Sequence, residues 1–205
     1  DVSLTEHKNN TLMCHYCGYI QKKPAKCPTC GSSYIAAFGI GTQKVEEYAK
    51  QEFPNARILR MDGDTTVKKG EYSRILHHFN SGDADILIGT QMVVKGHDFE
   101  NVALVAAMAA DLSLNMNDFR SAERTFQLLY QAAGRAGRRK STGEMIIQTY
   151  QPNHYSLEMV EKQDYEGFYE KELSYRKLLE YPHFGSILAI LVVSKSEPRV
   201  KQAAE

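Results

Sequence analysis

Residues 131–138, QAAGRAGR, have the composition of a site for a phosphate group. Arginine suits this task because its planar guanidinium stays charged and binds oxyanions through two N–H groups at once. If the segment is helical, Arg135 and Arg138 lie on one face, and the small residues around them leave that face open. The pattern therefore predicts charges aimed at a nucleotide bound on another surface. A solvated basic helix end, which complements the helix dipole, explains the same residues and stays an alternative.

Four cysteines form a second group of residues that could bind a ligand or do chemistry. They occur as two Cys-x-x-Cys pairs, Cys14 with Cys17 and Cys27 with Cys30. Each pair can form a turn that presents two thiolates to one tetrahedral zinc ion. Glycines and prolines beside the pairs supply turns, so the segment predicts a zinc ribbon or knuckle. A disulfide pair and a redox motif are the alternatives that the spacing leaves open.

The elements that must position these groups alternate between strand and helix. Helical periodicity follows Thr42, the expected N-cap of its helix, resumes after residues 62–66 and covers residues 118–138. Short apolar runs predict strands over residues 34–40, 57–61, 84–90, 102–108 and 143–149. This alternation predicts an α/β fold, a parallel sheet covered by helices on both faces.

Polar residues follow two of these strands. Gly89, Thr90 and Gln91 end the strand over residues 84–90, and a polar loop continues to Asp98. Open α/β sheets bind ligands at the carboxyl ends of their strands, so we expect a ligand here, with the arginine pair near this loop. Asp62 and Asp64 could be paired carboxylates, but turn and helix-cap roles are favoured.

Composition and pattern divide the chain into three regions. Lys plus Arg and Asp plus Glu number 25 each, so any anion site must be local. No apolar run reaches the roughly 20 residues that span a bilayer, which predicts a cytoplasmic protein with no membrane partner. The start at Asp1 predicts a piece of a longer protein. The predicted regions are a partial zinc-binding region (1–33), an α/β lobe (34–152) and the start of an α+β domain (153–205), with helices over 155–163 and 166–180 and a strand over 186–194.

Four blocks together resemble a known family: residues 89–92 (GTQM), 95–98 (KGHD), 118–124 (DFRSAER) and 131–138 (QAAGRAGR). The blocks are similar to motifs V and VI of superfamily 2 helicases. With the cysteine pairs upstream, the chain resembles the replication-restart DNA helicases of that superfamily over nearly its whole length. The resemblance implies the second, RecA-like motor lobe of an ATP-dependent 3′ to 5′ DNA helicase that restarts stalled forks and assembles the primosome.

The resemblance also implies site residues and ligands. Arg138 resembles an arginine finger for the γ-phosphate, with Arg135 and Gln131 beside it. Gly89, Thr90, Gln91 and Lys95 correspond to contacts to a DNA strand, while Gly96 and Asp98 correspond to contacts to the nucleotide. Lys95 and Asp98 resemble the polar contacts of this motif to the strand or ribose. The implied cofactors are zinc and ATP with magnesium. The implied partners are branched or forked DNA, single-stranded DNA, primosome proteins and single-strand binding protein.

Two departures from the family pattern limit what this chain is expected to do. It contains no G-x-x-x-x-G-K-[S/T] loop and no Asp-Glu box, so we expect no ATP hydrolysis by this chain alone. The family carries eight cysteines on two zinc ions, so the pairs Cys14–Cys17 and Cys27–Cys30 correspond to halves of two sites. The remaining alternative is a zinc-ribbon module that binds nucleic acid or primosome proteins without nucleotide chemistry.

Overall fold

The computed structural model describes residues 5–7, 10–13, 19–35, 41–94, 99, 101–116, 118–137, 143–188, 190, 192 and 196–204. Two compact units divide the chain: Gly39–Tyr175, and Asp1–Phe38 with Arg176–Glu205. None of the described helices is both long enough and apolar enough to cross a membrane. Six predicted site residues lie outside the described residues: Cys14, Cys17, Lys95, Gly96, Asp98 and Arg138.

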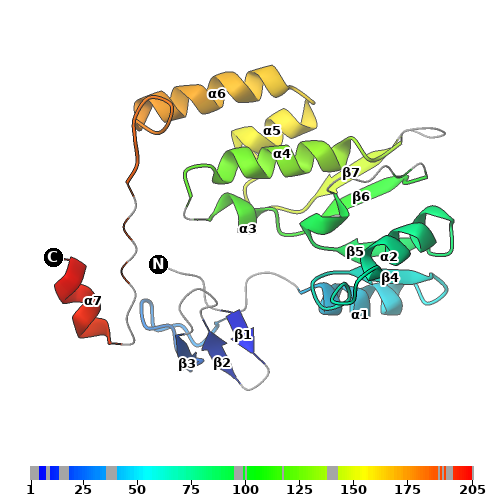
Figure 1. The fold of residues 1–205 in the computed structure, drawn as a ribbon, viewed down its shortest axis with the longest axis horizontal. Helices are drawn as coiled ribbons and strands as arrows, with labels where there is room; N and C mark the ends of the chain where they lie inside the picture. Colours follow the sequence, from blue (N-terminus) through cyan, green and yellow to red (C-terminus); the bar gives the residue numbers. More distant parts are fainter. Residues whose placement is uncertain are drawn as a thin grey trace. The chain divides into compact units, whose positions relative to one another are not determined.

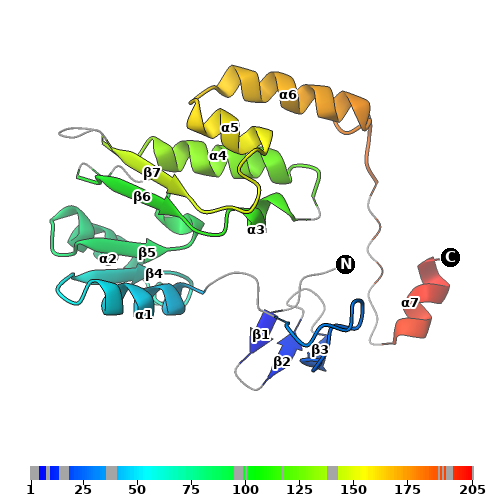
Figure 2. The ribbon, with the colours of Figure 1, turned by 180° about the vertical axis from the view of Figure 1, so that it is seen from behind.

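Four short strands form the centre of the larger unit. Strands β4 (Ile58–Met61) and β5 (Ile86–Gly89) pair in parallel, as do β6 (Leu104–Ala107) and β7 (Glu144–Ile147). All four run in the same direction in Figures 1 and 2. The predicted α/β fold with parallel strands is confirmed. Within the described residues, however, the strands make two separate pairs instead of one sheet, and most of the strand predicted over 34–40 lies outside those residues.

Two helices and a 3-10 turn surround the first strand pair. They are α1 (Thr42–Glu52), α2 (Glu71–Asn80) and η1 (Gln91–Val93). Met61 from β4, Ile75 and Leu76 from α2, and Phe99 are buried together, which is the apolar face that the periodicity of α2 predicted. The predicted N-cap is wrong by one residue, since Gly41 precedes α1 and Thr42 begins it.

Four helices accompany the second strand pair: α3 (Asp111–Leu114), α4 (Ser121–Ala133), α5 (Tyr155–Glu161) and α6 (Tyr165–Leu178). Phe126 of α4 is 1% exposed and stacks on Phe168 of α6, with ring centroids 3.9 Å apart. Leu157 and Val160 of α5 join the same core. The compact unit therefore continues to Tyr175, beyond the boundary at residue 152 that the change of pattern suggested.

The smaller unit contains three short antiparallel strands, β1 (Thr5–His7), β2 (Thr11–Met13) and β3 (Ile20–Lys22), in the order β1-β2-β3 (Figure 1). It also contains α7 (Glu197–Ala204). The strand predicted over 186–194 is absent from the residues of that segment that the structure describes, namely 186–188, 190 and 192.

Candidate functional site

Gly89 fixes the geometry at the carboxyl end of β5. A Cβ atom there would lie 2.3 Å from Val93 Cγ2 and 2.5 Å from the Met61 carbonyl oxygen, so only glycine fits beside β4. Thr90 follows in an extended conformation and its carbonyl accepts from Val93 N–H at 3.1 Å. Thr90 and Gln91 are exposed. The turn therefore presents two polar side chains at the carboxyl end of the strand, as the sequence predicted.

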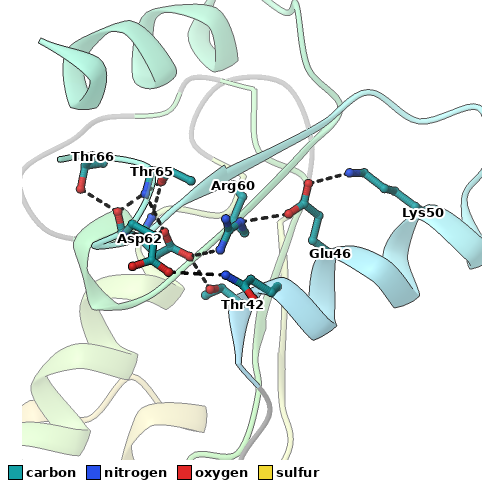
Figure 3. A network of polar contacts seen from close by, with 9 residues as sticks. Thr42, Glu46, Lys50, Arg60, Asp62, Thr65 and Thr66 are labelled. Atoms are coloured by element: carbon teal, nitrogen blue, oxygen red, sulfur yellow. Dashed lines mark hydrogen bonds and ion pairs between the residues drawn. The ribbon is translucent and has the colours of Figure 1, made fainter. Parts of the chain in front are cut away.

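Asp62, the residue after β4, is the buried centre of a polar network beside this turn (Figure 3). Its Oδ2 accepts from Thr42 Oγ1 and from Arg60 Nη1, both at 2.5 Å, while its Oδ1 accepts from Thr65 N–H at 3.0 Å. Arg60 also pairs with Glu46 of α1 at 2.9 Å. The network ties the start of α1 to the end of β4. Asp62 therefore has the predicted turn role, but it caps no helix, because Gly70 is the N-cap of α2.

The surroundings of Asp62 stabilise its charged form. Burial alone raises the pKa of a carboxyl group, because it disfavours the anion. Hydrogen bonds from Thr42 and Thr65 and the charge of Arg60 outweigh this effect and lower the pKa of Asp62 below its ordinary value. The carboxylate is consequently ionised at neutral pH and serves as an acceptor for the turn.

The arginine segment occupies a turn, not a helical face. Helix α4 ends at Ala133, and the backbone N–H groups of Arg135 and Ala136 donate to the carbonyls of Ala132 and Ala133 at 3.0 and 3.2 Å. Gly137 has φ of +76°, a left-handed conformation that favours glycine. The prediction of a helix to residue 138 is therefore wrong beyond Ala133.

Backbone contacts hold this turn against the amino ends of β6 and β7. Gly137 N–H donates to the carbonyl of Val102, two residues before β6, at 2.9 Å. A Cβ on Gly143 would lie 2.2 Å from the carbonyl carbon of Ala136, so glycine is required where β7 approaches the turn. Gln131 is exposed on the last turn of α4, and Arg135 is half-buried with its Nε atom inside the protein.

The two groups of predicted site residues thus lie at opposite ends of the parallel strands. Gly89, Thr90 and Gln91 stand at the carboxyl ends, while Gln131 and Arg135 stand at the amino ends, because α4 runs back along the strands before β7 begins (Figure 2). For Arg135, the described member of the arginine pair, the expected position near the residues that begin the polar loop is therefore not met. We call these two ends of the strands the carboxyl edge and the amino edge. A lobe of this form can contact two different ligands, one at each edge.

The second cysteine pair forms a tight turn in the smaller unit. Gly31 N–H donates to the Cys27 carbonyl at 2.9 Å, and Cys27 N–H donates to the Ser32 carbonyl at 2.8 Å. Hydrogen bonds from the backbone N–H of Cys30 and then of Thr29 lower the pKa of the Cys27 thiol. A turn that stabilises a thiolate fits a zinc ligand. Among the described residues, which leave out Cys14 and Cys17, no three His, Cys, Asp or Glu side chains are grouped to hold a metal ion.

Comparison with known protein families identifies the family of this chain. Residues 31–140, more than half of the chain, match the helicase conserved C-terminal domain. The chain belongs to this helicase family. The resemblance of motifs V and VI to helicases is thereby confirmed. The matched residues include Thr90 and Gln91 at one edge and Gln131 and Arg135 at the other, and they leave out all four cysteines.

Three proteins similar to this chain over nearly its whole length carry the name replication restart protein PriA. The protein of Bacillus subtilis (strain 168) is 50% identical over 198 residues, which cover 96% of this chain and 24% of that protein. The protein of Synechocystis sp. is 44% identical over 210 residues, covering 100% and 25%. The protein of Borreliella burgdorferi is 44% identical over 195 residues, covering 95% and 29%. The chain therefore spans between 24% and 29% of the length of these relatives.

Residues 118–124, another block of the resemblance, form local contacts at the start of α4. Asp118 lies just before α4 and accepts from the backbone N–H of Arg120 at 2.9 Å and from Arg124 Nη1 at 2.7 Å. The hydrogen bond from the Arg120 backbone N–H is the largest cause that lowers the pKa of Asp118, and the charges of Arg120 and Arg124 lower it further. Glu123 accepts from Gln127 at 3.1 Å. Arg124 therefore pairs with Asp118, the first residue of this block.

Sequence reasoning missed the buried carboxylate Asp111. It is 1% exposed and accepts from Thr149 Oγ1 at 2.9 Å and from Tyr150 N–H at 3.0 Å. Its position after an apolar strand was the available signal, but its acceptor role depends on residues almost forty positions later.

Proposed function

We propose that the chain is the second motor lobe of an ATP-dependent 3′ to 5′ DNA helicase that restarts stalled replication forks. The observation that carries the proposal is that one helicase C-terminal domain contains polar site residues at both ends of its parallel strands. The relatives named replication restart protein PriA supply the biological setting. Branched or forked DNA, single-stranded DNA, primosome proteins and single-strand binding protein are the proposed partners.

The amino edge is the proposed nucleotide side. Arg138, with Arg135 and Gln131, contacts the γ-phosphate of ATP bound by another lobe. Gly96 and Asp98, which follow η1 in the chain, are proposed to contact the same nucleotide. A guanidinium placed there stabilises the charge that develops during phosphoryl transfer. The close contact of Gly143 with the turn supports this role, since it fixes the backbone on which Arg135 stands. The chain has no phosphate-binding loop, so the proposal requires a second lobe for magnesium-ATP.

The carboxyl edge is the proposed DNA side. Gly89, Thr90, Gln91 and Lys95 contact the backbone of one DNA strand. The exposure of Thr90 and Gln91 beside the rigid Asp62 network supports this placement. Since nucleotide and DNA then bind at opposite ends of the same strands, movement of the lobe during hydrolysis changes both contacts together.

This function is favoured over a zinc-ribbon binding module without nucleotide chemistry. The family match begins at residue 31, after the last cysteine, so the shared part of the chain is the lobe and not the cysteine segment. The test uses a protein that joins this chain to a lobe with a phosphate-binding loop. We expect Arg138→Ala to lower fork-stimulated ATP hydrolysis about a hundredfold or more, with DNA affinity retained.

A matched control sharpens this test. Arg74 is exposed on α2, is not among the proposed contacts to nucleotide or DNA, and pairs with Glu71 at 2.6 Å, so Arg74→Ala removes the same charge elsewhere on the lobe. Its ATP hydrolysis is expected to stay near that of the parent. If both variants hydrolyse ATP at the parent rate, the arginine turn is structural and the nucleotide part of the proposal is wrong.

We also propose that Cys14, Cys17, Cys27 and Cys30 hold zinc. The turn from Cys27 to Gly31 supports this, because its N–H groups stabilise a thiolate. Four thiolates complete one tetrahedral shell, so the isolated chain is expected to bind about one zinc ion. Cys27→Ser should lower the zinc content measured by elemental analysis, whereas Thr29→Ser in the same turn should not. Equal zinc contents in all three proteins would contradict the site.

A further inference from the structure

The turn after β7 presents an aromatic ring on a fixed backbone. Tyr150 is 85% exposed, yet its backbone N–H donates to both carboxylate oxygens of Asp111, at 3.0 and 3.2 Å. Asp111 is 1% exposed and also accepts from Thr149 Oγ1. A buried carboxylate thus anchors the residues on which an exposed tyrosine stands. Such an anchor reduces the conformational entropy that is lost when a ligand contacts the ring.

The same turn is connected to a pair of arginines. Gln151 Nε2 donates to Asn115 Oδ1, at the end of α3, at 3.3 Å. The segment that continues from Asn115 leads into α4 and carries Arg120 and Arg124. Both guanidinium groups are about half exposed and share the single carboxylate Asp118. The two half-exposed guanidinium groups lie at the start of α4 with Asp118 and Glu123 beside them, and each can still donate to the oxygens of an anionic ligand.

We infer that Tyr150 is a stacking platform for a base of single-stranded DNA, with Arg120 and Arg124 placed for the adjoining phosphates. Aromatic side chains stack on every base, and arginines beside them follow the backbone, which is how proteins hold single strands without reading sequence. Tyr150 follows β7 at the carboxyl end, the edge that carries Thr90. This inference rests on the proposed function and extends its DNA contact from β5 to β7.

The experiment uses the absence of tryptophan from the chain. Tyr150→Trp introduces a single tryptophan, whose fluorescence falls when a base stacks on the indole. The 205-residue chain is titrated with fluorescently labelled oligothymidine, and anisotropy reports total binding. We expect quenching with oligothymidine and none with an abasic oligonucleotide of equal length and charge. Tyr34→Trp is the matched control, because Tyr34 is 84% exposed in the other unit, and it should not be quenched.

Affinity gives a second measurement. Tyr150→Ala should weaken oligothymidine binding about fivefold or more, in line with the stacking contribution of one base, while Tyr150→Phe keeps the parent affinity. DNA binding with an unquenched Tyr150→Trp and an unchanged Tyr150→Ala affinity overturns the platform and leaves the proposed function standing. Failure of the parent chain to bind any oligonucleotide overturns the platform together with the DNA contact of the proposed function.

Discussion

The two edges of the larger unit hold their functional residues by different means. At the carboxyl edge, the buried carboxylates of Asp62 and Asp111 accept N–H and O–H groups from turns that follow β4 and β7. At the amino edge, the arginine turn is held by backbone contacts among small residues, chiefly Gly137 and Gly143. Among the described residues, no buried carboxylate supports that turn.

This difference indicates what each edge tolerates. A carboxylate network allows small displacements, because hydrogen bonds accommodate modest changes in distance. Backbone-to-backbone contact allows almost none, since a methyl group has no space to occupy. We therefore expect the amino edge to respond most strongly to added volume and the carboxyl edge to the loss of charge. Substitutions at each edge can separate these responses.

The largest expected effect is that of Gly143→Ala. The new Cβ would lie 2.2 Å from the Ala136 carbonyl carbon and 2.3 Å from Gly137 N, so the backbone must move. We expect a loss of about 2–3 kcal/mol in the free energy of unfolding, measured by urea denaturation. Gly63→Ala, where a Cβ meets nothing within 4 Å, is the control and should change stability by less than about 0.5 kcal/mol. Equal midpoints for the two variants would contradict the contact.

The sequence predicted the strands of the domain better than the arginine turn. β4, β5, β6 and β7 lie within predicted apolar runs. The runs locate the strands even though β6 and β7 alternate between exposed and half-buried residues. The end of α4 was predicted five residues too late. The apolar period continues to Ala133, but Gly137 adopts a left-handed conformation that periodicity does not reveal.

A smaller effect is expected from Asp62→Asn. The amide keeps the shape of the side chain but removes the charge that faces Arg60, so this arginine, only 16% exposed, keeps its ion pair with Glu46 and loses the one with Asp62. We expect a loss of about 2 kcal/mol at neutral pH. Asp64→Asn is the matched control, because Asp64 is exposed in the same turn and accepts only a long contact from Gln43. If both substitutions have the same effect, the network does not depend on the buried charge.

Sequence reasoning could place Asp62 in a turn, but it could not distinguish the burial of Asp62 from the exposure of Asp64. Both follow the strand and both favour turns. The distinction depends on Thr42, whose hydroxyl reaches Asp62 from twenty residues earlier in the chain. Asp111 and Thr149 are separated in the same way. Local pattern identifies such residues as polar, whereas tertiary contact decides which of them support a site.

The smallest effect is a change with pH, and it tests whether the contribution of Asp62 is ionic. The folded state lowers the pKa of Asp62 below its ordinary value of 3.8, so unfolding raises proton affinity. The stabilisation is therefore fully present above about pH 5 and is lost as pH falls through the lower pKa of the folded protein. The difference in unfolding free energy between the parent and Asp62→Asn should consequently shrink as the pH falls below about 5. A difference that stays constant over this range would mean that Asp62 stabilises the turn by shape and neutral hydrogen bonding, and the contrast between the two edges would lose its electrostatic basis.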